Sequence, residues 1–244
     1  KLISHFGTLS LKGFGVDDLP SAVIAAGAAM HYLSETHHHH LNHIVNLQRI
    51  EATNHVWMDR FTIRNLELFQ SVSQGAITLM DIIDYTITPM GSRMLKRWLA
   101  FPLKEPKKIE ERLSAVDFFI DIDTHDLVKH IKEIGDLERL ITKVATSRIN
   151  PREVVALKRA LIAIGPIKEF CESCNNKTLT QLASKLNSCD IIKERIQMEI
   201  NDDAPLTISK GNVILSGVNT ELDELRSLAK DSHHHLQEIL ERET

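Results

Sequence analysis

The sequence predicts a mainly α protein: a multi-helix domain with a small α/β remnant at the N-terminus and a few short strands. From Phe61 onward, apolar residues recur at the spacing of amphipathic helices. Helix starts that contain proline, such as Thr88-Pro89 and Asn150-Pro151, divide this region into separate helices. Strand-like runs are short and few, so helix packing is expected to form most of the core.

The N-terminal segment, residues 1–36, has the pattern of the end of an α/β unit. "GFGV" (Gly13–Val16) has turn glycines and the short apolar ending of a strand that leads into a loop. Two aspartates then precede Pro20 and an alanine-rich run, which predicts a helix start. One such unit cannot cover both faces of a sheet, so we expect the chain to be truncated on its N-terminal side.

Further extended segments are predicted at three places. Ile44–Glu51 and His55–Asp59 flank "ATN" and predict a hairpin. After Phe61 the strand pattern returns only at Asn212–Gly217.

The stretch "TITPMGSRMLKRWLAFPL" (Thr86–Leu103) predicts a helix with two chemically different faces. Thr88 is the expected N-cap and Pro89 the first helical residue. At about 100° per residue, one arc of roughly 140° collects the large apolar side chains, which are Met90, Met94, Leu95 and Trp98. This arc is expected to pack inward and to bury Trp98.

The opposite arc of this helix is basic and consists of Arg93, Lys96 and Arg97. These three residues are candidates either for contacts with nucleic-acid phosphates or for ion pairs between helices. The carboxylates of "GDLER" (Gly135–Arg139) are suitable partners, and pairing is the favoured interpretation. Such pairs would also hold adjacent helices in register.

Two later helices follow the same local rules. In "KEPKKIEERLSAVDFF" the charges alternate in sign, which is typical of a solvated helix face rather than of catalytic carboxylates; beside them runs an apolar seam of Ile109, Leu113, Val116 and Ile120. Asn150-Pro151 starts another helix, and Gly165-Pro166 is predicted to end it and to begin the next one.

The last segment predicts a long helix that needs a partner. Its apolar positions follow a heptad seam: Leu222, Leu225, Ala229, Ser232, Leu236 and Ile239. From Asn219 to Thr244 such a helix would be about 39 Å long. It has no stop signal, so we expect it to continue beyond this chain, and to fray after about Ala229 unless another copy covers the seam.

Composition excludes several classes of protein. The 244 residues carry a net charge of −4, so no global positive field attracts a polyanion. Three cysteines provide no disulfide framework, which fits a reducing compartment. The longest apolar stretch, Ala22–Met30, is far too short for a membrane span. These features predict a cytoplasmic protein without a membrane contact.

No catalytic, cofactor-binding or metal-binding residue is predicted. The histidine runs (His37–His40 with His43, and His233–His235) point in several directions on a helix or loop, whereas zinc needs converging ligands. "CESC" (Cys171–Cys174) has no second pair and lies in a helical pattern, so structural thiols are favoured. The sequence contains no phosphate loop, dinucleotide-binding turn or nucleophile elbow.

Several of these stretches, in this order, resemble the MutS family of DNA mismatch-repair proteins. "FGTLSLKGFGV" is similar to the end of that family's connector domain, and "MDRFTIRNLELFQ" to the start of its core domain. "TITPMGSRMLKRWLAFPL", "IEERLSAVDFF", "GDLERL" and "NPREVVALKRAL" resemble the core itself. "GVNTELDELR" resembles the helix that leaves the core toward the DNA clamp, with Val218 at a position where relatives usually carry an aromatic residue.

The resemblance implies three parts: the end of a connector domain (residues 1–36), a core domain (37–218) and the first lever helix (219–244). It implies a structural role that couples binding of mismatched double-stranded DNA to an ATPase domain outside this chain. It also implies ATP and Mg²⁺ as ligands of the parent protein, a homodimeric parent and a MutL-type repair partner. None of these ligands is expected to bind this chain itself.

Two other interpretations stay open at this point. The chain could be a stand-alone helical protein-interaction module whose heptad helix pairs with another chain. It could also be a metalloprotein that uses its histidine clusters.

Overall fold

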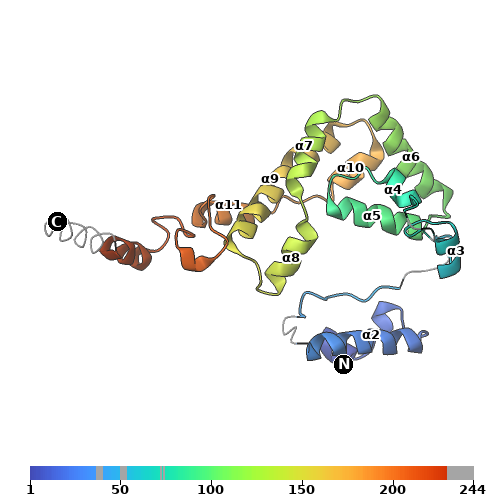
Figure 1. Cartoon of the computed structure of the whole chain (residues 1–244), viewed down its shortest axis with the longest axis horizontal. Coiled ribbons are helices and arrows are strands. Elements are labelled where there is room, and N and C mark those ends of the chain that lie inside the picture. The colour runs from blue at the N-terminus through green and yellow to red at the C-terminus, as the bar shows by residue number, and fades with distance from the viewer. Residues whose placement is uncertain (37–40, 50–53, 72, 74, 230–244) are drawn as a thin grey trace. The chain divides into compact units, whose positions relative to one another are not determined.

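A computed structural model describes residues 1–36, 41–49, 54–71, 73 and 75–229. Figure 1 labels the helices along the chain, and the chain divides into two compact units. Unit 1 consists of Lys1–Ile149 and Arg159–Ser188, and unit 2 of Asn150–Lys158 and Cys189–Thr244. Each unit is described separately below.

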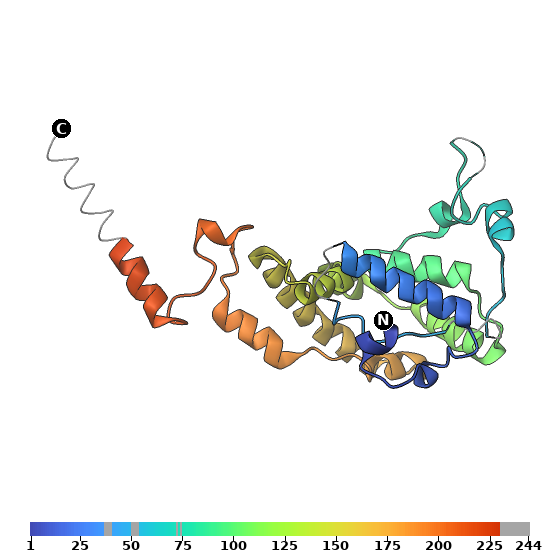
Figure 2. The same ribbon diagram turned by 90° about the horizontal axis from the view of Figure 1, so that it is seen from below.

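The described residues are mainly helical, as predicted. The elements, in chain order, are α1 (Leu2–Phe6), the 3₁₀ helix η1 (Lys12–Phe14), α2 (Pro20–Glu35), α3 (Arg60–Asn65), α4 (Leu79–Ile83), α5 (Pro89–Ala100), α6 (Pro106–Ile120), α7 (His125–Ile134), α8 (Leu137–Ala145), α9 (Pro151–Ser173), α10 (Lys177–Ala183), α11 (Asp190–Glu199) and the 3₁₀ helix η3 (Ile208–Lys210). Residues 220–229 form one further helix, red in Figure 2. Strand pairing in the described part of the chain is limited to isolated bridges.

The N-terminal segment forms a small helical cluster rather than an α/β unit. Leu2, Leu11 and Val16 are its buried residues, and side chains of α2 pack against them. The strand predicted at Gly13–Val16 is wrong, because this segment lies in η1 and the turn after it. Gly15 adopts φ 64° and its N–H donates to the carbonyl of Lys12, so the chain turns there instead of extending.

The predicted hairpin around "ATN" is wrong in the residues that the structure describes. His55 forms an antiparallel bridge with Leu103 instead of pairing with the preceding run. The amide of Val56 donates to the carbonyl of Pro102 over 2.8 Å, and that of Lys104 to the carbonyl of Asn54 over 3.2 Å. A long-range partner therefore replaces the local one, which residue propensities alone do not reveal.

The start of α9 is confirmed, but the predicted break at Gly165-Pro166 is wrong. The Asn150 side chain accepts from the amide of Glu153 over 2.9 Å, and the Glu153 carboxylate accepts from the amide of Asn150 over 3.1 Å. The helix continues through Pro166 to Ser173. Proline removes one helical hydrogen bond, but buried residues on both sides of it, among them Ala163 and Cys171, keep the helix packed.

Within unit 1, α6 and α10 pack together beside the second half of α9. Their shared core contains Cys171, Leu179 and Ala183, flanked by aromatic side chains of α6 and α9. The rings of Phe119 and Phe170 stack with centroids 6.3 Å apart. This packing covers one face of α6 and leaves its apolar seam on another face.

Among the described residues, no helix is both long and apolar enough to cross a membrane.

Candidate functional site

The start of α5 is held by a hydroxyl and carboxylate network. Thr88 caps the helix as predicted, accepting from the amide of Gly91 over 3.1 Å. Asp84 accepts from the hydroxyl groups of Ser92 at 2.6 Å and Thr86 at 2.5 Å. These bonds hold the pKa of Asp84 below its ordinary value, with the Ser92 hydroxyl as the main cause. The helix therefore begins at a fixed position relative to the loop before it.

Arg93 connects α5 to α8 through two carboxylates. Its guanidinium donates to Asp136 at 2.7 and 3.1 Å and to Glu138 at 2.6 and 3.0 Å. Asp136 is also the N-cap of α8, so one carboxylate serves both the helix start and the ion pair. The hydrogen bonds from Arg93 are the main cause of the lowered pKa of Asp136. In this structure Arg93 thus pairs α5 with α8, and whether it contacts phosphate stays a prediction.

Trp98 is not buried, contrary to the expectation for the apolar arc. Its side chain is 40% exposed, and the guanidinium of Arg112 lies 3.7 Å from the ring centroid. Trp98 thus packs under an arginine of α6 rather than inside a hydrocarbon core. The reason is the neighbouring helix: α6 presents a cation to α5 at this point, and the α5 sequence alone does not show it.

The other two basic candidates of α5 differ from Arg93. Lys96 lies over the ring of Phe69, 5.2 Å from its centroid. The Arg97 guanidinium makes no hydrogen bond or ion pair with any residue that the structure describes. Whether Lys96 or Arg97 contacts phosphate stays a prediction.

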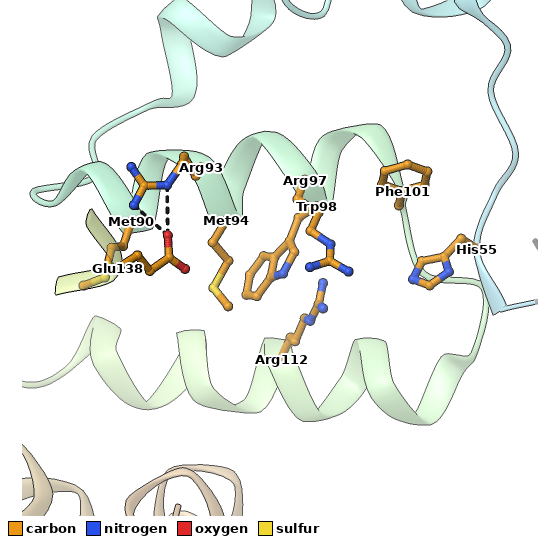
Figure 3. Close-up of a pocket in the computed structure, with 10 residues that line it drawn as sticks. His55, Met90, Arg93, Met94, Arg97, Trp98, Phe101, Arg112 and Glu138 are labelled. Atoms are coloured by element: carbon orange, nitrogen blue, oxygen red, sulfur yellow. Dashed lines mark hydrogen bonds and ion pairs between the residues drawn. The ribbon is translucent and has the colours of Figure 1, made fainter. Parts of the chain in front are cut away.

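A cavity of about 520 Å³ lies between α5 and α6 (Figure 3). Its walls combine apolar side chains with arginines; they include Met90, Met94, Trp98, Phe101, Arg97 and Arg112. Arg93 and Glu138 form one end of the cavity, and His55 lies near Phe101 at the other (Figure 3). Sequence reasoning missed Arg112, because its membership depends on how α6 packs.

Unit 2 anchors the helix 220–229 at its first turn. Asn219 caps it by accepting from the amide of Leu222 over 2.9 Å. The Asp223 carboxylate accepts from the amide of Gly217 at 2.6 Å and from Arg226 at 3.0 Å. Arg226 also donates to the carbonyl of Ile214 over 2.7 Å. The amide of Gly217 is the main cause of the lowered pKa of Asp223.

These bonds tie the helix to a strand-like segment that the sequence predicted near Asn212–Gly217. Ile214 forms an antiparallel bridge with Ile200, at the end of α11. The amide of Asn201 donates to the carbonyl of Val213, and the amide of Leu215 donates to the carbonyl of Glu199, each over 2.9 Å. The start of helix 220–229 is thus fixed to the segment around Ile214. Of the predicted heptad seam, Leu222, Leu225 and Ala229 lie in this helix, and Ser232 onward lies outside the described residues.

A buried lysine in unit 2 was also missed by sequence reasoning. The Lys158 side chain is 7% exposed and pairs with Asp202, whose side chain is 64% exposed. The pair joins the first part of α9 to the segment after α11. In the sequence, only the presence of a lysine on an otherwise apolar helix face could have indicated a buried ion pair. Its partner lies 44 positions later and could not be identified from local sequence.

The thiols and histidines form no reactive or metal centre among the residues the structure describes. Burial is the main cause of the raised pKa of both Cys171 and Cys174, which disfavours the thiolate. No group of three or more histidine, cysteine or acidic side chains gathers in the described ranges. The runs His37–His40 and His233–His235 lie outside those ranges.

Comparison with known proteins identifies the family. The sequence pattern described as MutS domain III matches residues 61–243. The DNA mismatch repair protein MutS of Christiangramia forsetii is 52% identical over 245 aligned residues, covering 100% of this chain. The MutS proteins of Bacteroides fragilis and Flavobacterium johnsoniae are 49% and 48% identical, again over 100% of the chain.

The chain spans 28% of the length of each of these three relatives. Because the domain pattern covers most of the chain and the relatives align with all of it, the chain belongs to the MutS family and contains its domain III.

Proposed function

We propose that this chain is the structural core and lever base of a MutS-type mismatch-recognition protein. In the parent protein it would couple binding of mismatched double-stranded DNA to an ATPase domain that uses ATP and Mg²⁺. The observation that carries this proposal is the braced first turn of helix 220–229, because the domain III match continues through this helix. A helix fixed at its base can transmit a movement along its length, whereas a frayed one cannot.

The assignment of parts accompanies this proposal. Residues 1–36 would be the end of the connector domain, 37–218 the core, and 219–244 the first lever helix. The domain III match starts at residue 61 and so includes most of the proposed core together with the lever helix. The same proposal includes a homodimeric parent protein and a MutL-type repair partner that binds the parent. The contacts of both would involve the parent protein as a whole rather than this chain alone.

The pairing of Arg93 supports a packing role for α5. If Arg93, Lys96 and Arg97 all contacted phosphates, the salt dependence of DNA affinity would have a slope of about −2.7. Between 50 and 200 mM salt the affinity would then fall by about 40-fold. Because Arg93 is already bound to two carboxylates, we expect a shallower dependence.

The experiment titrates the 244-residue chain against two fluorescently labelled duplexes that differ by one mismatched base pair. We expect weak binding and equal dissociation constants for the two duplexes by fluorescence anisotropy. The full-length product of the gene serves as the positive control and should prefer the mismatched duplex. A clear preference by the chain alone would mean that it reads mismatches itself, contrary to the proposal.

A further inference from the structure

The cavity between α5 and α6 contains more positive than negative charge. Three arginines line it: Arg93, Arg97 and Arg112. Arg93 is neutralised by two carboxylates at its end of the cavity. Across the ranges that the structure describes, no carboxylate pairs with the guanidinium of Arg97 or Arg112.

These two guanidinium groups point toward each other beside Trp98 (Figure 3). Two like charges in this position repel, and water screens part of this repulsion because Arg97 is exposed and Arg112 is half-buried. Burial lowers the pKa of Arg112, with no acidic group to oppose the effect. The ring of Trp98 stabilises the charge on one face of the Arg112 guanidinium. It does not accept hydrogen bonds from the N–H donors at the edge of the guanidinium plane. These donors are therefore available to an acceptor on a ligand.

The walls of the cavity favour a single carboxylate over a polyanion. A nucleic-acid groove needs a row of cations that follows the backbone, together with exposed aromatic platforms. Here only Arg97 and Arg112 converge, and Met94, Trp98 and Phe101 contribute apolar surface to the same cavity (Figure 3). Glu138 lies at the rim and would repel additional negative charge. Two planar guanidinium groups match the two oxygens of one carboxylate.

An exposed apolar stripe on α6 lies directly beside Arg112. Ile109 precedes Arg112 by three residues and Val116 follows it by four, so both are its neighbours on the helix surface. Together with Leu113 and Ile120 they are between 37% and 73% exposed. The seam that the sequence predicted is thus present on α6, and no element among the described residues covers it. A ligand that reaches the arginine pair would contact this apolar stripe as well.

We propose that this cavity and the adjacent stripe bind a segment of another protein chain that presents a carboxylate between apolar side chains. The Asp or Glu carboxylate accepts hydrogen bonds from Arg97 and Arg112, and the flanking apolar residues cover the α6 stripe. The site differs from the lever base of unit 2, and it does not depend on the proposed function of that helix.

The test uses Trp98 as the reporter in the 244-residue chain. The protein has two tryptophans, so Trp57→Phe leaves Trp98 as the only one. This protein is titrated with the capped peptides ALELA and ALQLA, which differ only in the charge of the central residue. We expect a saturable change in Trp98 fluorescence with ALELA, and binding of ALQLA that is about tenfold weaker.

Two variants separate the arginine pair from general charge effects. Arg97→Gln, which leaves the Arg112–Trp98 contact intact, should weaken ALELA binding by about tenfold. Arg97→Lys keeps the charge but loses the planar fork, so it should have an intermediate effect. Lys107→Gln, on the same helix α6 but outside the cavity lining, is the matched control and should bind ALELA normally. Circular dichroism checks that each variant keeps its helix content.

Several outcomes would overturn the proposal. These are the absence of a response to ALELA, equal binding of ALQLA, or an Arg97→Gln variant that binds as well as Lys107→Gln. A response to a single-stranded oligonucleotide or to inorganic phosphate, without one to ALELA, would assign the site to phosphate instead.

Discussion

We expect the link between Arg93 and Asp136 to depend on pH. The ordinary pKa of the Asp136 carboxyl is 3.8, and the folded protein lowers it through the hydrogen bonds from Arg93. A carboxyl whose pKa is lower in the folded state stabilises the fold at pH values above the unfolded value, and this contribution is lost as the pH falls toward the folded value. The ion pair should therefore contribute fully above about pH 5 and progressively less below pH 3.8.

Urea unfolding of the chain and of Arg93→Gln, measured across this pH range, tests the prediction. The variant should be less stable than the parent chain at neutral pH, and the difference should shrink as the pH falls below 3.8. Lys107→Gln makes the same change of charge on α6, outside the Arg93 ion pairs, and is a suitable control. A stability difference for Arg93→Gln that is the same at all pH values would show that Arg93 acts through packing alone.

Lys158 and Asp202 form an asymmetric ion pair, because the lysine is buried and the aspartate is mostly exposed. Removing the carboxylate leaves a buried ammonium group with a weaker partner, so Asp202→Asn should lower the free energy of unfolding by about 1–3 kcal/mol. Lys158→Met replaces the buried charge with an apolar chain of similar length and should cost less than Asp202→Asn. Chemical denaturation of both variants measures the two values, and a larger loss for Lys158→Met would contradict this assignment.

At the scale of single elements, the cap of α5 controls where that helix begins. Thr88→Ala removes the acceptor for the Gly91 amide and should destabilise the chain by about 1 kcal/mol. Thr88→Ser retains the hydroxyl group and should retain most of the stability. Thermal unfolding monitored by circular dichroism compares the two variants. Equal losses would mean that the threonine methyl group, rather than the cap, is responsible.

Helix starts could be predicted because they depend on residues next to one another. Thr88-Pro89 and Asn150-Pro151 both begin helices in the structure as the sequence indicated. Features that depend on distant partners could not be predicted. The passage of α9 through Pro166 depends on packing on both sides of it, and the pairing of His55 with Leu103 depends on a segment far along the chain.

The candidate site was predictable to a similar extent. From the sequence, charge pointed to the carboxylates of Gly135–Arg139 as partners of the basic arc of α5, and among the described residues Arg93 alone of that arc pairs with them. Arg112 could not be predicted, because nothing in its own helix indicates that it lies over Trp98. Its position follows from the packing of α5 against α6, which is a tertiary property.

At the scale of the whole molecule, side-chain contacts fix several helices in position within each unit. In unit 1, α5 is held to α8 by Arg93 and to α6 by the Trp98–Arg112 contact. In unit 2, Asp223 and Arg226 hold helix 220–229 to the segment around Ile214. A scaffold of this kind suits the proposed role of a domain III chain, which is to transmit movement rather than to perform chemistry.

The proposed coupling depends most directly on the base of helix 220–229. Asp223→Asn weakens the bond that holds this helix to Gly217, and also the bond to Arg226, which itself donates to Ile214. Glu224→Gln makes the same change of charge at the next position, which is exposed, and is the matched control. Neither residue lies at a site that we assign to DNA or ATP.

The decisive measurement is the affinity of the full-length protein for a mismatched duplex, with and without a non-hydrolysable ATP analogue. The ratio of the two dissociation constants gives the coupling between nucleotide and DNA. We expect Asp223→Asn to bind the duplex normally without nucleotide and to reduce this ratio by about fivefold or more, while Glu224→Gln leaves it unchanged. An unchanged ratio in Asp223→Asn would show that the base of this helix does not carry the coupling.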